Sequence, residues 1–247
     1  MTSKRALAGV SILFVLATLA ACGGGGGGGG GGVTVTPPPS NVPRFAYVAN
    51  GSDNTVSIYT VNAATGQLRH NGYVATEASP HSVSVDPSGK FAYVANWGSN
   101  TVSAYTTNAS TGALTSVGAA VPAGTWPYAV TVDPTGKFAY VANEASFNVS
   151  AYTINASTGA LTSVGAAVAT GSIPQSVTVD PSGRFAYVAN LASNSISAYT
   201  INTSTGALTS VGAGVATGTN PVPVVVDPSG RSVYAANSGS FNVSAYT

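Results

Sequence analysis

The stretch Phe91-Ala92-Tyr93-Val94-Ala95-Asn96 decides the fold, because the chain repeats it. The same six letters begin at Phe45, Phe138 and Phe185, and a degenerate copy, Ser-Val-Tyr-Ala-Ala-Asn, begins at Ser232. The successive intervals are 46, 47, 47 and 47 residues. A second motif, Val-Asp-Pro, keeps this period, with its aspartate at Asp86, Asp133, Asp180 and Asp227. Periods of about 40 to 50 residues are typical of repeat architectures, propellers among them.

One repeat predicts four short strands, which we call A to D from the axis outward. Residues 81–85 alternate in polarity and form strand A; Asp-Pro-Ser-Gly at 86–89 is a turn, with proline presetting φ and glycine taking a positive φ. Residues 90–96, 101–106 and 114–117 form strands B, C and D. Strand B is apolar on both faces, as expected when blades pack face to face. The sequence therefore predicts an all-β propeller of four-stranded antiparallel blades, with about 47 residues per repeat.

The number of blades is unusual. The repeat domain begins in strand B at Arg44 and stops in strand C at Thr247, which gives three complete and two partial blades, or 18 strands. We expect either a truncated sequence, or an open arc or a rare smaller ring. An open arc would expose the apolar faces of its end blades and so favour self-association.

The motifs Phe-Ala-Tyr-Val-Ala-Asn, Asn-Thr-Val-Ser, Thr-Gly-Ala-Leu-Thr and Val-Asp-Pro-Ser-Gly-Lys resemble the YVTN repeat and the related lactonase-like propellers. The resemblance covers residues 44–247. It implies a ring of seven blades and either of two functions. Some members open sugar lactones such as 6-phosphogluconolactone, and others are cell-surface repeat proteins without known chemistry.

The N-terminus has the layout of an export signal: Lys4 and Arg5, an apolar run over 6–21, and then Cys22. The ending Leu-Ala-Ala-Cys resembles the bacterial lipobox, which implies cleavage before Cys22 and a lipid anchor on it. An ordinary signal peptide with an incidental cysteine is the alternative. We expect residues 1–21 to be the signal peptide, 22–43 a glycine- and proline-rich tether, and 44–247 the repeat domain. The lipobox resemblance also implies a location in the bacterial cell envelope, at the outer membrane or cell surface, because Gly23 stands where many such lipoproteins of the inner membrane have aspartate.

Composition excludes several classes of function. Charged residues make up 6% of the chain and the net charge is +1, so a nucleic acid is not expected as a partner. One cysteine and two histidines leave no room for a disulfide framework and little for a metal site, and we expect neither a metal nor a cofactor.

Comparison of the repeats with one another separates the scaffold from a candidate surface. The A–B and C–D turns barely vary, and they lie on one face of a propeller. The B–C turns and D–A loops lie on the opposite face and differ between repeats; we call this the variable face. The candidate binding residues there are Glu77, His81, Trp97, Trp126, Tyr128 and Glu144.

His81 is the sharpest candidate, because it opens an innermost strand at the mouth of the channel and its pKa class suits acid–base chemistry. Pro80-His81 resembles a feature of the lactonase-like family, in which such a histidine lines the site. The plain alternative is a polar residue at a wet channel mouth, since Tyr128, Gln175 and Val222 occupy equivalent positions. The tryptophans suit contact with a sugar or peptide, or else they cap the gap between blades.

We interpret the chain as an envelope lipoprotein whose variable face binds a small molecule, glycan or protein without catalysis. The alternative is a lactone hydrolase that uses His81; for such a site the resemblance implies arginine and carboxylate partners, and no arginine is placed for that. A third reading is a fragmentary gene whose product has no stable role.

Overall fold

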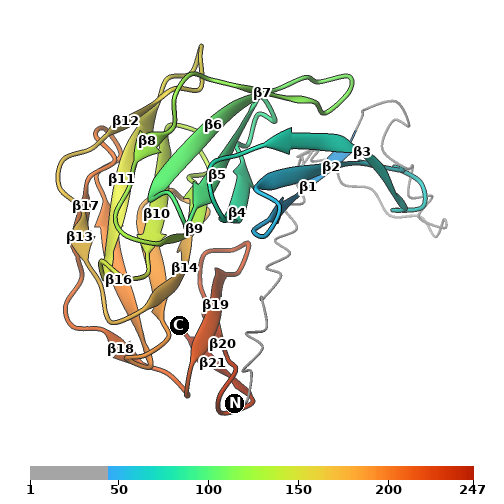
Figure 1. The fold of residues 1–247 in the computed structure, drawn as a ribbon. Helices are drawn as coiled ribbons and strands as arrows, with labels where there is room; N and C mark the ends of the chain where they lie inside the picture. The colour runs from blue at the N-terminus through green and yellow to red at the C-terminus, as the bar shows by residue number, and fades with distance from the viewer. Residues whose placement is uncertain (1–43) are drawn as a thin grey trace, which may run out of the picture.

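The computed structural model describes residues 44–247, which form five antiparallel sheets arranged as blades along an arc (Figure 1). No helix occurs among these residues, so none could cross a membrane. The blades follow one another in sequence order, which confirms the predicted all-β propeller architecture. The predicted signal peptide, Cys22 and the tether lie outside the described residues.

The strand order within each blade is the predicted one, from A at the inside to D at the outside. Strand A is β4 (Pro80–Val85), β9 (Pro127–Val132), β14 (Pro174–Val179) and β19 (Pro221–Val226). Strand B is β1 (Arg44–Asn50), β5 (Phe91–Asn96), β10 (Phe138–Asn143), β15 (Phe185–Asn190) and β20 (Val233–Asn237). Strand C is β2 (Thr55–Val61), β6 (Thr101–Thr107), β11 (Asn148–Ile154), β16 (Ser195–Ile201) and β21 (Asn242–Tyr246).

Strand D differs from the prediction. We number the five blades 1 to 5 in chain order, so that blade 1 holds β1 and blade 5 holds β21. Strand D is continuous only in blade 1, as β3 (Leu68–Ala75). In blades 2, 3 and 4 it forms two short pieces, which are β7 (Leu114–Ser116) and β8 (Val121–Pro122), β12 (Leu161–Ser163) and β13 (Val168–Ala169), and β17 (Leu208–Ser210) and β18 (Val215–Ala216). Both pieces pair with the same strand C. A turn at Gly118, with φ +74°, separates the first two pieces, and the equivalent breaks bring the predicted 18 strands to 21.

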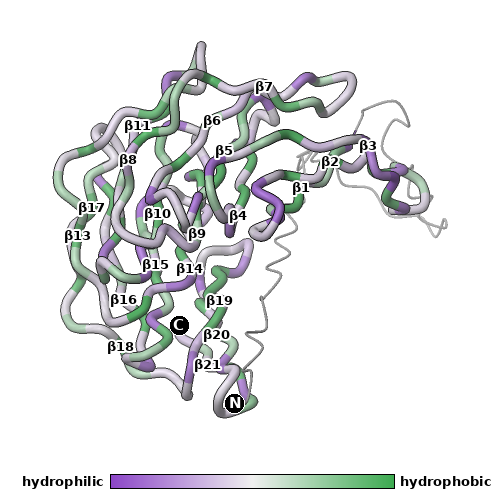
Figure 2. The backbone as a smooth tube through the Cα atoms, viewed as in Figure 1, coloured by the Kyte–Doolittle hydropathy of each residue, from purple (hydrophilic) through white to green (hydrophobic). Residues whose placement is uncertain are grey.

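The hydrophobic core is divided among the junctions between blades. Four clusters of buried side chains lie one at each junction, and Figure 2 shows hydrophobic residues spread through all the blades. Strand β5 is buried at every position. Its two-sided apolar pattern is thus explained by contact with a blade on either side.

The recurring motif residues join each blade to the next. The Tyr93 hydroxyl in blade 2 donates to the carbonyl oxygen of Gly159 in blade 3, over 3.0 Å. The Phe91 ring lies against the same glycine. A Cβ atom added to Gly159 would lie 2.3 Å from the Cδ1 atom of Phe91. In the opposite direction, Tyr152 of blade 3 donates to the carbonyl oxygen of Pro122 in blade 2. These contacts recur at the other junctions that have both partners.

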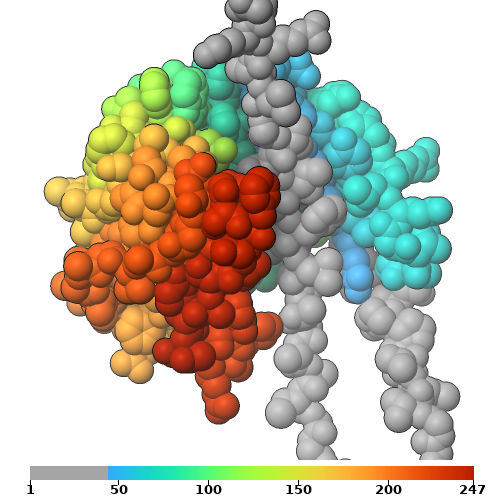
Figure 3. Space-filling model, turned by 90° about the horizontal axis from the view of Figure 1, so that it is seen from below, coloured from blue at the N-terminus to red at the C-terminus, as the bar shows by residue number. Residues whose placement is uncertain are grey.

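The aspartates of the A–B turns stabilise the predicted turns. Asp86 accepts a hydrogen bond from the backbone N–H of Phe91 at 2.7 Å, and its other oxygen accepts from Ser88. The end blades 1 and 5 expose apolar side chains, among them Tyr73, Val225 and Val243. Figure 3 shows blade 5, in red, as one end of the packed series.

Candidate functional site

Five of the six predicted binding residues meet on the variable face at the junction of blades 2 and 3. Trp97 and Trp126 stack, with ring centroids 4.7 Å apart and planes at 23°. The centroid of the His81 imidazole is 4.6 Å from the centroid of the Tyr128 ring and 5.9 Å from that of Trp97. The Trp97 Nε1–H donates to Oε2 of Glu144 over 3.2 Å. The residues therefore form one connected cluster, which we call the junction cluster.

The repeat explains why these side chains meet. His81 and Tyr128 are the second residues of β4 and β9, and they stand in equivalent positions on neighbouring inner strands. Trp97 and Glu144 each follow the motif asparagine that ends strand B. The backbone N–H of Glu144 donates to the carbonyl oxygen of Trp126 at 2.8 Å, which ties the B–C turn of blade 3 to the loop before it.

Trp126 sits in an uncommon backbone conformation. Its φ is +57°, and its backbone N–H donates to Oδ1 of Asn100 at 2.8 Å. The equivalent residues Ser79, Ile173 and Asn220 also have positive φ, so the loop of the fold imposes this conformation. An indole in this region is disfavoured relative to asparagine, and Trp126 nevertheless keeps 42% of its surface exposed.

The environment favours a neutral imidazole at His81. Burial lowers the pKa of His81 from its ordinary 6.5, and the negative charge of Glu144 opposes this more weakly. Burial also raises the pKa of the Tyr128 hydroxyl above 10.0, with a smaller contribution from Glu144. At neutral pH the cluster therefore holds a neutral base and a protonated phenol beside Glu144.

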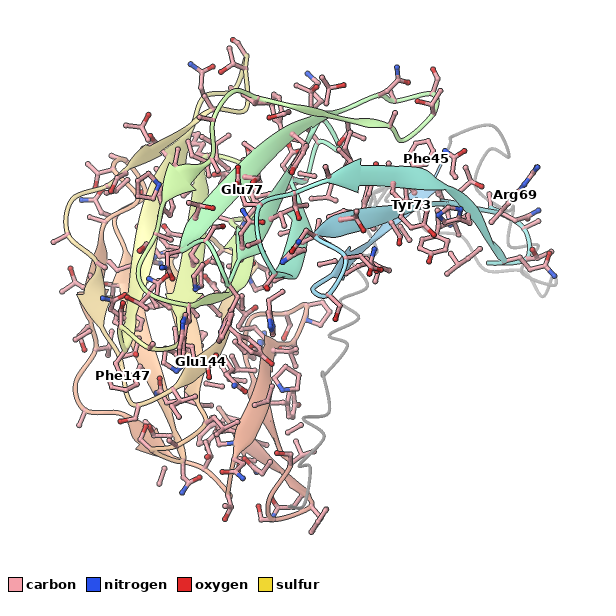
Figure 4. All side chains as sticks on the ribbon, in the orientation of Figure 1. Phe45, Arg69, Tyr73, Glu77, Glu144 and Phe147 are labelled. Atoms are coloured by element: carbon pink, nitrogen blue, oxygen red, sulfur yellow. The ribbon has the colours of Figure 1, made fainter. Side chains whose placement is uncertain are left out.

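Charge is segregated between the two faces of the domain. The variable face carries the carboxylates of Asp53, Glu77 and Glu144. Within residues 44–247, no lysine or arginine lies on that face: Arg44, Lys90, Lys137, Arg184 and Arg231 precede or begin strand B at the opposite end, and Arg69 lies on outer strand β3. Figure 4 shows Arg69 far from both Glu77 and Glu144. The described chain thus offers this face no cationic group for a phosphate.

Glu77 does not join the cluster. It is exposed in the loop that follows β3, and its charge acts on the Tyr105 hydroxyl, whose pKa is raised chiefly by burial. The tryptophans bridge the two blades, as the predicted capping of the gap requires, and Trp126 remains exposed; contact with a sugar or peptide stays a prediction.

One residue at the site escaped the sequence reasoning, because Asn100 fixes the Trp126 backbone. Its equivalent in blade 3 is Phe147, which has φ +51° and is 45% exposed, and whose carbonyl oxygen accepts from the backbone N–H of Thr170 in the loop that leads to blade 4. The signal was present, since this turn position carries asparagine in three repeats and phenylalanine in the other two: Asn54, Asn100, Phe147, Asn194 and Phe241. Among the described residues, no group of three or more histidine, cysteine or acidic side chains could hold a metal ion.

The comparisons identify the family. The model of the family described as lactonase, seven-bladed β-propeller, matches residues 38–125, 120–177 and 172–247. Together these segments cover most of the chain, and the protein belongs to this family. No curated protein sequence matches the chain.

Solved structures share the fold at low sequence identity. A protein from Bacteroides uniformis, provisionally assigned as a 6-phosphogluconolactonase, is 22% identical with a TM-score of 0.73, over 83% of this chain and 64% of its own. A protein from Lactobacillus plantarum gives 22% and 0.73, over 82% of this chain and 63% of its own. The periplasmic gluconolactonase PpgL of Pseudomonas aeruginosa gives 22% and 0.68, over 83% and 63%. The chain thus spans less than two thirds of the length of these structures.

Proposed function

We propose that this protein is a lactone hydrolase and that the junction cluster is its reaction site. The observation that carries the proposal is the half-buried His81 imidazole, whose pKa is lowered by burial, packed on Tyr128 and within the electrostatic reach of Glu144. The attack of water on an ester carbonyl is assisted by a base that is unprotonated at the working pH, and a histidine whose pKa lies below 6.5 is unprotonated at pH 7. Family membership and the lactonase names of two similar structures support the same chemistry.

In this reaction His81 takes a proton from water while the water oxygen adds to the carbonyl carbon of the lactone. The carbonyl oxygen becomes an oxyanion, and the Tyr128 hydroxyl is the available donor to it, because its raised pKa keeps it protonated. The ring C–O bond then breaks, the carbonyl re-forms, and the imidazolium returns the proton to the departing ring oxygen. The product is the open-chain hydroxy acid.

Glu144 has a supporting role in this scheme. Its negative charge raises the pKa of His81 and so stabilises the imidazolium that forms after proton transfer. The hydrogen bond from Trp97 fixes the carboxylate beside the cluster. Glu144 is accordingly a positioning and electrostatic residue rather than the base.

The test is the hydrolysis of gluconolactone by the full chain, measured as acid release above the rate in buffer. The variant His81→Gln carries the residue that blade 4 has at this position, Gln175, so the scaffold accommodates it. We expect a loss of about 10²- to 10⁴-fold in kcat, the usual contribution of general base catalysis. His70→Gln is the matched control, because His70 is exposed on β3, away from the cluster. Absence of any enzymatic rate in the unchanged chain, or equal rates for both variants, would refute the proposal.

Binding without catalysis is the second candidate. It is favoured by the lack of any arginine on the variable face within the described residues, since the family resemblance implies such a partner in lactonase sites. Saturable binding of gluconolactone with no hydrolysis, unaffected by His81→Gln, would support it.

We also propose that Cys22 carries a lipid and anchors the chain in the bacterial cell envelope, on the strength of Leu19-Ala20-Ala21-Cys22 alone. Incorporation of a labelled fatty acid should occur in the unchanged chain and be lost in Cys22→Ser. Equal labelling of both would overturn the lipid assignment.

A further inference from the structure

The tryptophan pair in the junction cluster is not explained by the hydrolysis of a lactone. Trp126 is held at positive φ, where asparagine is the easier residue, and blade 5 has Asn220 at that position. The indole is stacked on Trp97 on one side and remains 42% exposed. The chain thus presents a large aromatic surface to solvent at a backbone position that disfavours it.

An anion is fixed beside this aromatic surface. The Glu144 backbone N–H donates to the Trp126 carbonyl at 2.8 Å, and Oε2 of its side chain accepts from Trp97 Nε1 at 3.2 Å. No other hydrogen-bond donor reaches this carboxylate within residues 44–247. One carboxylate oxygen is therefore left for a ligand at the edge of the stacked rings.

No positive charge of the described chain compensates this anion. The variable face also bears Asp53 and Glu77, and all lysines and arginines from residue 44 onward lie elsewhere. Burial favours the neutral form of the neighbouring His81. The face would repel an anionic ligand. A neutral sugar can donate a hydrogen bond to the carboxylate, but only a cation adds charge pairing to that contact.

We propose that Trp97, Trp126 and Glu144 form a binding site for an organic ammonium group. The cation would lie over the exposed indole surface and pair with the free oxygen of Glu144, so that cation–π attraction and charge pairing act together. This site goes beyond the hydrolase function and does not require it. The class of ligand is an alkylated or primary amine, which is neither a substrate nor a product of lactone hydrolysis.

The chain contains its own reporter, because Trp97 and Trp126 are its two tryptophans and both lie in the site. Choline chloride is titrated into the full chain at constant ionic strength while intrinsic fluorescence is recorded. Dimethylbutanol, in which carbon replaces the charged nitrogen of choline, is titrated in parallel. We expect a saturable change with choline and an affinity at least about ten-fold weaker for the uncharged isostere.

The variants use residues that other blades carry at the same positions. Glu144→Ser follows Ser238, and Trp126→Asn follows Asn220. We expect the first to weaken choline binding about five- to ten-fold and the second to abolish it. Phe147→Asn removes a neighbouring exposed aromatic ring and should leave the affinity unchanged. Circular dichroism of each variant confirms that the β structure is retained.

Three results would overturn the proposal: no saturable response to choline in the unchanged chain, equal affinity for choline and its isostere, or equal losses in Phe147→Asn and Trp126→Asn. The second would show a purely apolar patch. Because no lactone is present in these titrations, their failure leaves the hydrolase test unaffected, and failure of hydrolysis leaves choline binding intact.

Discussion

The contact between Phe91 and Gly159 should be the most sensitive point of the junction between blades 2 and 3. Gly159 has φ +77°, and an added Cβ would lie 2.3 Å from Cδ1 of Phe91. The substitution Gly159→Ala therefore combines two penalties. An alanine at positive φ costs about 1–2 kcal/mol, and forcing an extra carbon into a packed contact costs about 1–3 kcal/mol.

The same blade provides the control. Gly165 has φ +64° and has no atom within 4 Å of the position its Cβ would take. Gly165→Ala thus carries the backbone penalty alone, about 1–2 kcal/mol. The smaller entropy of the unfolded alanine chain stabilises both variants by about 0.4–1 kcal/mol and cancels in the comparison. The difference between the two free energies of unfolding should be about 1–3 kcal/mol, the steric penalty.

The assay is equilibrium unfolding in urea, followed by tryptophan fluorescence. Trp97 and Trp126 stack across this very junction, so their signal reports its loss even if the blades do not unfold together. In the double variant Phe91→Ala, Gly159→Ala the steric penalty should disappear, which gives a coupling free energy of the same size as the difference. Equal losses in Gly159→Ala and Gly165→Ala, or no coupling, would refute the packing argument.

Three further predictions concern the hydrogen bonds and charges of the variable face. Phe147→Asn should raise the free energy of unfolding by about 1 kcal/mol, because asparagine tolerates φ +51° and can accept from the next loop as Asn100 does; a urea titration that shows destabilisation would contradict this. The pKa of His81 is lower in the folded chain than the ordinary 6.5, so protonation of His81 favours unfolding. The contribution of His81 to the free energy of unfolding should be constant above pH 6.5 and should fall as the pH drops from 6.5 toward the folded pKa; His81→Gln should flatten that part of the curve of stability against pH. If lactone hydrolysis is found, kcat/KM should decline on the acid side with an apparent pKa below 6.5, and Glu144→Gln should move that pKa lower still, because the Glu144 charge raises it; an upward shift, or the same shift in Glu77→Gln, would disprove the assignment.

The repeat made the fold predictable, because its invariant residues are those that blades need to contact one another. The period, the turns and the two-sided apolar pattern of Phe91–Asn96 are local features of the sequence. The second half of strand D could not be predicted in this way. Val121 and Pro122 form β8 because they pair with Val102 and Thr101, and that pairing is set by the turn at Gly118 rather than by any strand signal in two residues.

The site was predictable to the level of a face and no further. Repeat topology places His81 and Tyr128 on adjacent inner strands, and it puts Trp97 and Glu144 in equivalent turns. Whether side chains from two blades touch depends on rotamers and loop geometry, which the sequence does not reveal. Glu77 illustrates the limit, because it belongs to the same face but lies exposed near the end of β3, apart from the cluster.

The position of the site at a junction has a physical consequence for its function. The junction cluster takes His81 and Trp97 from blade 2, and Tyr128 and Glu144 from blade 3, and no covalent element other than the outer strand and its loop fixes their separation. The distance between base and carboxylate is instead maintained by contacts across the junction, among them those of Phe91, Tyr93 and Tyr152 and the hydrogen bond from Trp97 to Glu144. Site geometry and blade packing are therefore coupled. A substitution that loosens the junction, such as Gly159→Ala, should weaken the stacking of Trp97 on Trp126 and the binding of ligand before it unfolds the domain, although Gly159 lies outside the cluster.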